Sequence, residues 1–185
     1  MSAVHTYSGL LFDITNPRPE LVSVADIAYA LARIPRWNGN TTEYWTVADH
    51  SIWVAQHLRE QGASREMQLA GLLHDAHEAY VSDIPWPVKA LFREVLDPVT
   101  ERIDRVIEKV FGLPAKILRS PDIHSADMIA AATERRHLLK ENPHWPWDPN
   151  YPPAAVLHPA GSEIPEQSEA AFRGRLSSLW APETR

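Results

Sequence analysis

Helix start and stop signals follow one another along most of the sequence, and they constrain the fold more than any other feature. Ser23 and Thr46 each stand three residues before an aspartate, which is the pattern of a helix N-cap with a carboxylate in the first turn. Apolar residues then recur at helical spacing, and a proline or glycine stops most of these segments. The signals predict helices over residues 23–34, 46–58, 64–80, 88–92, 97–112 and 120–140.

Evidence for β-strands is confined to residues 7–14, where a Ser8-Gly9 turn favours a small hairpin. From Pro143 onward the composition changes, because eight of the sixteen prolines fall in the last 43 residues. We expect an ordered but irregular strap there, followed by a terminal helix over about 170–180 that packs back onto the body. The predicted fold class is therefore all-α, with a small N-terminal β-hairpin and a proline-rich C-terminal strap. Three tryptophans argue against a disordered tail: Trp145, Trp147 and Trp180.

The length of 185 residues fits one hydrophobic core. We expect a single domain over 1–185, with a core at about 23–141 and an extension at 143–185 that packs on it. The first residues contain no positive segment followed by an apolar stretch, and no apolar run approaches the roughly 18 residues that span a bilayer. These features predict a cytoplasmic protein without membrane association.

The absence of cysteine, beside nine histidines, limits the available chemistry. Disulfides, cysteine-ligated zinc, iron–sulfur clusters and thiol nucleophiles are excluded. A metal site would have to use imidazole nitrogens and carboxylates. The formal net charge of −6 also disfavours large nucleic acids as partners, because binding to their backbone depends on surplus Lys and Arg. A phosphate-bearing substrate would need local positive charge or a metal.

Metal-ligating side chains stand on three of the predicted helices. On one continuous helix over 64–80, His74 and Glu78 lie one turn apart on a polar face, and Asp75 follows His74 directly. His50 on the helix over 46–58 and Asp127 on the helix over 120–140 have small neighbours that leave room for an ion. Two imidazoles and two carboxylates would suit a catalytic divalent cation with open water positions.

At these residues the sequence resembles the HD-domain metal-dependent phosphohydrolases. The matching segments follow the order of the bacterial HD-domain 5′-deoxynucleotidases and of the phage HD enzymes that act on deoxynucleoside triphosphates, and they span about 35–134. They are Arg36-Trp37, Ala48-Asp49-His50-Ser51, Leu73-His74-Asp75-Ala76-His77-Glu78-Ala79-Tyr80, Asp83-Ile84-Pro85-Trp86-Pro87-Val88-Lys89 and a late Asp127. The resemblance implies an HD-domain helical bundle with metal ligands His50, His74, Asp75 and Asp127.

The resemblance also assigns groups around the scissile phosphate. It places Glu78 and Asp83 beside the bond that breaks, where one would orient or deprotonate water and the other would protonate the leaving oxygen. It places Arg36 and Lys89 at the substrate phosphate. Trp37 could lie against a sugar or base, or serve only in packing. For the other four residues the alternatives are ordinary surface cations at Arg36 and Lys89, a solvated helix-end carboxylate at Glu78 and a turn residue at Asp83.

Three further histidines stand near the predicted ligands. His77 occupies a position where the family usually has a small residue. We expect it to contact a metal-ligating side chain without touching the ion, or to lie on the surface. His124, one turn before Asp127, is another supporting candidate. His57 lies two turns beyond His50, which is too far along a helix to share one ion.

The predicted function is metal-dependent hydrolysis of the 5′-phosphate of deoxynucleoside monophosphates. The alternative within the same chemistry is release of tripolyphosphate from deoxynucleoside triphosphates. A non-catalytic nucleotide-binding HD module is a third hypothesis, and it would predict a missing ligand or acid–base residue. A zinc metallopeptidase is disfavoured, because the glutamate spacing differs from that of the zinc helices. The residue pattern suits Mn, Co, Zn, Fe, Ni or Mg, and the resemblance implies a homodimer or higher homo-oligomer.

Overall fold

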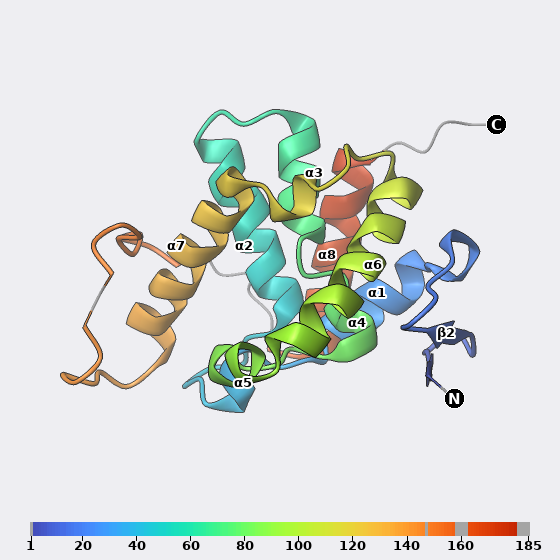
Figure 1. Cartoon of the computed structure of the whole chain (residues 1–185). Helices are drawn as coiled ribbons and strands as arrows, with labels where there is room; N and C mark the ends of the chain where they lie inside the picture. Colours follow the sequence, from blue (N-terminus) through green and yellow to red (C-terminus); the bar gives the residue numbers. More distant parts are fainter. Residues whose placement is uncertain (1, 147, 158–162, 181–185) are drawn as a thin grey trace.

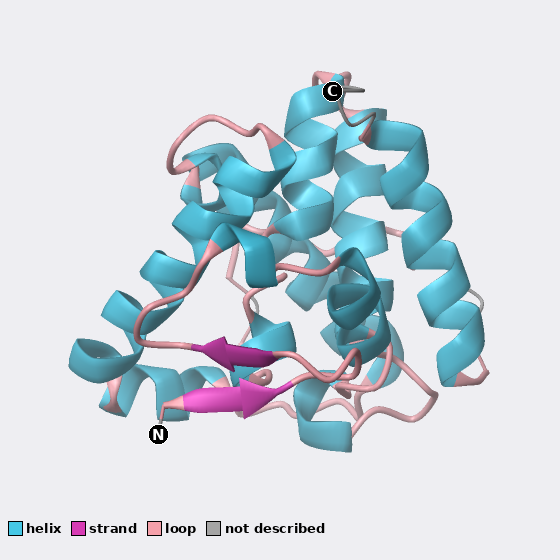
Figure 2. Ribbon diagram, turned by 90° about the vertical axis from the view of Figure 1, so that its right-hand side faces the viewer, coloured by secondary structure: helices cyan, strands magenta, loops and turns pink. Residues whose placement is uncertain are grey.

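Helices form most of the structure, a computed structural model that describes residues 2–146, 148–157 and 163–180. Figure 1 shows them gathered around α2 and α3, and Figure 2 shows the one small hairpin at the N-terminal end. The prediction of a mostly helical chain with an N-terminal hairpin is confirmed. Trp147, which we expected in an ordered extension, lies outside the described residues.

The hairpin is formed by β1 (Ala3–His5) and β2 (Leu11–Asp13), which pair antiparallel with Val4 opposite Phe12. Gly9 in the turn has a φ of 86°, a left-handed conformation that glycine adopts without steric cost. The Phe12 side chain is fully buried and its ring stacks on Tyr80 at 3.7 Å. The hairpin is therefore part of the core. The prediction of strands only within 7–14 is wrong for the first strand, because all of β1 lies before residue 7.

The helical elements follow the chain in the order shown in Figure 1. They are η1 (Pro19–Leu21), α1 (Val24–Leu31), η2 (Arg36–Gly39), α2 (Val47–Glu60), α3 (Arg65–Leu73), α4 (Glu78–Val81), α5 (Trp86–Leu91), α6 (Arg93–Phe111), η3 (Ile117–Arg119), α7 (Pro121–Leu138) and α8 (Pro165–Leu179). Thr46 and Asp49 form the complete capping box at α2. Ser23 caps α1, but the Asp26 carboxylate accepts bonds from Ser8 instead and ties the hairpin to this helix.

The prediction of one continuous helix over 64–80 is wrong. α3 ends at Leu73, and a tight turn over 74–77 separates it from α4. In this turn the amides of Ala76 and Glu78 donate to carbonyls three residues back, as in a 3₁₀ turn. His74 and Glu78 are thus not one α-helical turn apart, because the turn re-aims the side chains that follow α3.

Other helix boundaries also differ from those predicted. α6 begins at Arg93 rather than at 97 and contains Pro98 in its second turn, while α5 begins at Trp86 rather than at 88. α8 begins at Pro165 rather than at about 170. Pro98 predicts a helix start, but it lies in the second turn of α6, where the helix continues without the hydrogen bond that a proline nitrogen cannot donate.

The core lies around α2, which packs on α3, α7 and α8. A Cβ at Gly71 of α3 would collide with Leu58 of α2, so this glycine allows the two helices to approach closely. α8 packs on α1, α2 and α3, and its buried Ser168 hydroxyl donates to Asp49 at 3.0 Å. In the proline-rich segment, the amide of Ala154 donates to Thr133 of α7. No helix in the described part of the chain is long and apolar enough to cross a membrane.

Candidate metal centre and adjoining cleft

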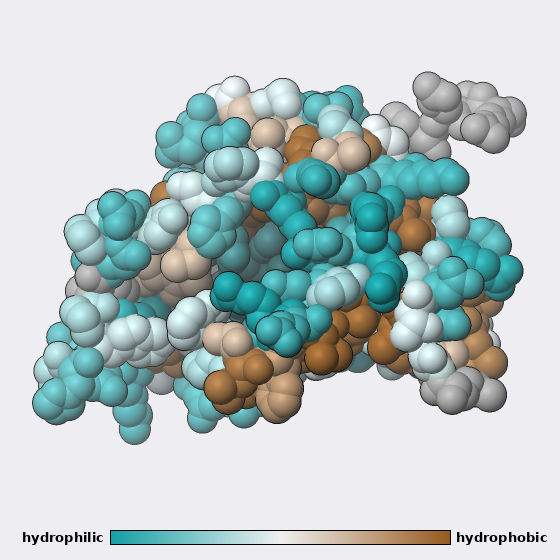
Figure 3. Space-filling view, in the orientation of Figure 1, coloured by the Kyte–Doolittle hydropathy of each residue, from teal (hydrophilic) through white to brown (hydrophobic). Residues whose placement is uncertain are grey.

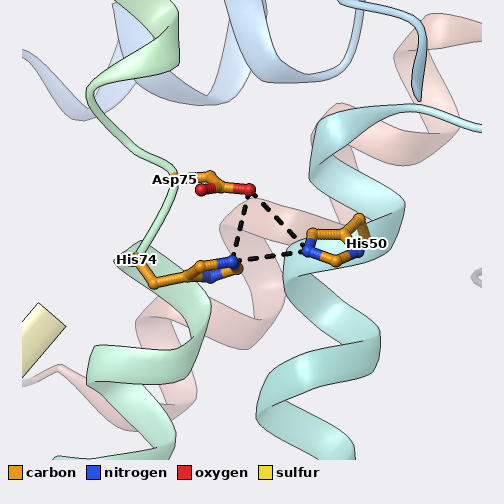
Figure 4. Close-up of side chains that lie close together, drawn as sticks. All are labelled: His50, His74 and Asp75. Carbon is orange, nitrogen blue, oxygen red and sulfur yellow. Dashed lines mark hydrogen bonds and ion pairs between the residues drawn. The ribbon is translucent and has the colours of Figure 1, made fainter. Parts of the chain in front are cut away.

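Three side chains from two neighbouring elements point toward one another in the middle of the helical core (Figure 4). His50 comes from α2, and His74 and Asp75 from the turn that follows α3. The two Nε2 atoms are 3.3 Å apart, and Asp75 Oδ2 lies 3.2 Å from His74 Nε2 and 3.7 Å from His50 Nε2. These ligand atoms are close enough to contact one ion.

Asp127 brings a second carboxylate to the same point from α7. Its Oδ1 lies 3.1 Å from His50 Nε2 and 3.8 Å from His74 Nε2. The structure therefore brings together all four residues that the sequence suggested as metal ligands. They come from three segments widely separated in the chain, as predicted from the positions of the helices.

The far sides of both imidazoles are held by acceptors. His50 Nδ1 donates to Glu134 Oε1 at 2.6 Å, and His74 Nδ1 donates to the carbonyl of Gly71 at 2.9 Å. A carbonyl can only accept, so the proton of a neutral His74 resides on Nδ1. The Nε2 atom of each neutral imidazole then presents its lone pair to the centre of the cluster.

Neutral imidazoles and ionised carboxylates would place four acceptors and no donor at this point. Such a group is stable only when protons or a cation neutralise it. Burial lowers the pKa of His74, but Asp75 and Asp127 outweigh burial and hold the pKa well above its ordinary value. Two imidazole nitrogens and two carboxylate oxygens are a ligand set that fits a divalent transition metal. The metal would displace the protons that otherwise neutralise the cluster.

Glu134 is the residue that the sequence did not single out. It is fully buried in α7, and besides His50 it accepts from the indole nitrogens of Trp45 at 2.9 Å and Trp37 at 2.8 Å. Arg36 donates to it as well, at 3.2 Å from Nη2. Only its position in the sequence relates Glu134 to the site. Asp127 stands seven residues earlier, and residues seven apart on a helix share a face.

Glu78 begins α4 and is almost completely buried. Lys89 donates to its Oε1 at 3.0 Å, and Oε2 has no hydrogen-bond partner among the described residues. Burial raises the pKa of Glu78 to about 7, and the charge of Asp75 adds to this effect while Lys89 opposes it. A carboxyl with this pKa can both hold and release a proton near neutral pH.

The remaining predicted site residues form a network beside the cluster. Arg36 Nη1 lies 3.5 Å from Asp83, and Lys89 Nζ lies 3.8 Å from the same carboxylate. Arg36 and Trp37 stand in η2, where Trp37 has a φ of 55°. Because Arg36 and Trp37 are both engaged with Glu134, their contact with a substrate stays a prediction.

His77 is buried rather than on the surface. Its Nδ1 lies 3.0 Å from Asp104 Oδ1 of α6, and Asp104 accepts from Arg119 Nε through its other oxygen at 2.6 Å. His77 can also approach Asp75 and Glu78 closely enough for the three to contact one ion. His57 instead stacks on Trp53.

A cleft of about 350 Å³ opens from the metal ligands toward α6, η3 and the start of α7. Figure 3 shows a hollow near the centre of this face, surrounded mostly by hydrophilic residues. The volume falls within the range of small-molecule sites. The lining includes three metal-ligand candidates and a set of polar and apolar residues beyond them: His74, Asp75, His77, Val81, Ser82, Ile84, Lys89, Leu96, Asp97, Thr100, Asp104, Leu118, Arg119, Ile123, His124 and Asp127.

No protein-family model matches the chain. The uncharacterized protein YfdR of Escherichia coli strain K12 is 36% identical over 147 residues, which cover 79% of this chain and 78% of YfdR. An uncharacterized protein of Rhodobacter capsulatus is 36% identical over 138 residues, which cover 71% of this chain and 70% of that protein. The chain therefore belongs to the protein family that includes YfdR.

Proposed function

We propose that the chain is an HD-domain metal-dependent phosphohydrolase that removes the 5′-phosphate from deoxynucleoside monophosphates. The observation that carries the proposal is the convergence of His50 Nε2, His74 Nε2, Asp75 and Asp127 Oδ1 on one point at the end of a cleft. The order and identity of these residues resemble those of the HD-domain 5′-deoxynucleotidases. The backing of both imidazoles by fixed acceptors favours metal binding.

A divalent cation at such a site neutralises charge on a phosphoryl oxygen and makes water more acidic. The chain supplies the proton transfers. Glu78, with its pKa near 7 and its unpartnered Oε2, exchanges a proton with water or with the leaving oxygen. Asp83 lies between the cations of Arg36 and Lys89, and Lys89 also donates to Glu78, so we assign the second proton transfer to Asp83.

The charges around the cleft favour a single phosphate group. Its lining contains four aspartates, namely Asp75, Asp97, Asp104 and Asp127, against the cations of Lys89 and Arg119. Arg135 and Arg136, which could neutralise a longer phosphate chain, line a different hollow beside Trp145. A divalent cation would balance Asp75 and Asp127, and Lys89 and Arg119 would then face Asp97 and Asp104, so the lining offers no surplus of positive charge for a longer phosphate chain. Hydrolysis of monophosphates is therefore favoured over release of tripolyphosphate.

The experiment that tests this proposal is a panel of ribo- and deoxynucleoside mono- and triphosphates, each assayed with Mn²⁺, Co²⁺, Mg²⁺ or Zn²⁺. We expect orthophosphate from deoxynucleoside monophosphates. Tripolyphosphate from triphosphates would replace the monophosphate proposal with the triphosphohydrolase alternative. If metal-loaded protein hydrolyses none of these nucleotides, the proposed function is wrong and a non-catalytic module becomes the better account.

A further inference from the structure

Arg119, at the end of η3, is held rigidly on the wall of the cleft. Its Nε donates to Asp104 Oδ2 at 2.6 Å and its Nη2 donates to Thr100 Oγ1 at 2.8 Å. Asp104 is itself buried, with 3% of its surface exposed. Two acceptors on α6 thus set both the position and the plane of the guanidinium.

These two bonds use only one edge of the guanidinium, the edge formed by Nε and Nη2. The other edge, formed by Nη1 and the second hydrogen of Nη2, has no partner among the residues that the structure describes. It carries two parallel N–H donors. The side chain is 37% exposed and lines the cleft, so a ligand in the cleft can reach the guanidinium.

The position of Arg119 relates it to the metal ligands. Asp104 contacts Arg119 with one oxygen and lies 3.0 Å from His77 with the other, and His77 stands two residues after Asp75. Arg119 is therefore separated from the ligand cluster by two side chains. A nucleotide with its phosphate at the cluster would extend its sugar and base along this wall.

The surroundings of Arg119 favour a neutral ligand group over a second phosphate. Asp97 and Asp104 line the same cleft on α6, so carboxylates outnumber the one guanidinium there. Leu96, Leu118 and Ile123 add apolar surface to the wall. A flat, uncharged ring with hydrogen-bond acceptors on one edge fits these three properties.

We infer that Arg119 recognises the base of the nucleotide and selects bases with two adjacent acceptors on one edge, an inference that rests on the proposed function. Guanine offers O6 and N7, which arginine binds through two parallel bonds. Cytosine offers O2 and N3. Adenine places its amino group beside N7, and thymine places N3–H between its two carbonyls, so neither presents such a pair.

The test compares kcat/KM for dGMP, dCMP, dAMP and dTMP in the wild type, Arg119→Lys and Arg119→Ala. Arg136→Ala is the matched control, because Arg136 is an exposed arginine outside this cleft. We expect the wild type to favour dGMP and dCMP by about 5- to 150-fold, the worth of one bidentate pair. Both Arg119 variants should lose this preference, mainly through KM, and the control should keep it.

Binding of dGMP and dAMP to metal-stripped protein, measured by calorimetry, gives a second readout that does not depend on turnover. Arg119→Lys keeps a cation beside Asp104 and decides the question if Arg119→Ala fails to fold. Equal kcat/KM for the four substrates in the wild type, or a preference that survives in the folded Arg119 variants, would overturn the inference and leave the proposed function intact. If no nucleotide is hydrolysed, the proposed function fails, and equal affinity for dGMP and dAMP then also rejects the role of Arg119.

Discussion

The two sides of the cleft are built differently. On the ligand side, His50 and Glu134 are completely buried, and each imidazole of the cluster is held by a second contact behind it. Beside the cleft, α5 and the start of α6 expose large apolar side chains, and Figure 3 shows brown surface at its lower edge, where Figure 1 places α5. These side chains are Trp86 at 73%, Leu91 at 80%, Phe92 at 56% and Val95 at 68% exposure.

This difference indicates that the metal-ligand side is rigid and that the α5 side can move more easily. Packing and hydrogen bonds fix the ligand side before any substrate arrives, as a metal site requires. The α5 side has few buried apolar contacts, which is the property of segments that open or shift at low cost. Lys89 belongs to α5 and reaches Glu78, so the less packed side also contributes a positive charge beside the candidate metal centre.

The largest effect is expected from His74→Ala, which removes one ligand nitrogen from the fixed side. We expect loss of bound metal and a fall in hydrolysis of roughly 1000-fold or more, because the ion supplies several kcal/mol of charge stabilisation. Elemental analysis and phosphate release measure the two quantities. His137→Ala, at an exposed position of α7, is the control. A His74 variant that retains full metal content would show that the cluster is not the metal site.

Glu78→Gln tests whether the buried carboxyl exchanges protons or holds the ion. The amide keeps the shape and the contact with Lys89 but cannot exchange a proton, so we expect normal metal content and a rate about 100- to 10,000-fold lower. Glu94→Gln on the exposed start of α6 is the matched control. Loss of metal from the Glu78 variant would instead make Glu78 a ligand together with Asp75 and His77.

Glu134 should make the stability of the metal-free protein depend on pH. Burial acts to raise the pKa of Glu134, but Arg36 and His50 outweigh it and lower the pKa to about 2. The unfolded chain therefore takes up this proton first as the pH falls. Stability that is present above about pH 4.5 is lost toward pH 2, by roughly 3 kcal/mol for this group.

Urea unfolding of the wild type and of Glu134→Gln measures this contribution. The wild type should be the more stable of the two at pH 6, and the difference should shrink steadily as the pH is lowered to 3. A difference that is independent of pH would mean that the Glu134 carboxylate is not stabilised by its two cationic neighbours.

The smallest effect is expected on the α5 side. Leu91→Ala should change the free energy of unfolding by less than about 0.5 kcal/mol, because the side chain is 80% exposed. Leu72→Ala in α3, where the side chain is fully buried, should cost about 2–5 kcal/mol. A large loss at Leu91 would show that this face is covered in solution and would remove the contrast between the two sides.

Sequence patterns predicted those parts of the molecule that depend on local signals. The caps at Thr46 and Ser120 placed α2 and α7, and with them His50 and Asp127. The break after Leu73 could not be predicted in this way, because apolar periodicity continues to Tyr80 while hydrogen bonds three residues apart tighten the turn. Helical periodicity does not distinguish a straight helix from one that ends in such a turn.

The residues that support the site were harder to predict than the ligand candidates. Glu134 precedes two arginines near the end of a helix and resembles a solvated residue until Trp37 and Trp45 are seen to donate to it. The position of the Arg119 side chain likewise depends on a hydrogen bond to Asp104, which belongs to a different helix. Such partners are set by tertiary packing, and one sequence carries no periodic signal for them.

The most direct test of the central proposal is a metal titration of protein stripped with a chelator, followed by orthophosphate release from a deoxynucleoside monophosphate. The stripped protein should be inactive, and activity should rise linearly with added Mn²⁺ or Co²⁺ until the cluster of His50, His74, Asp75 and Asp127 is filled. Full activity in the stripped protein, or a filled site without release of phosphate from any nucleotide, would contradict the account.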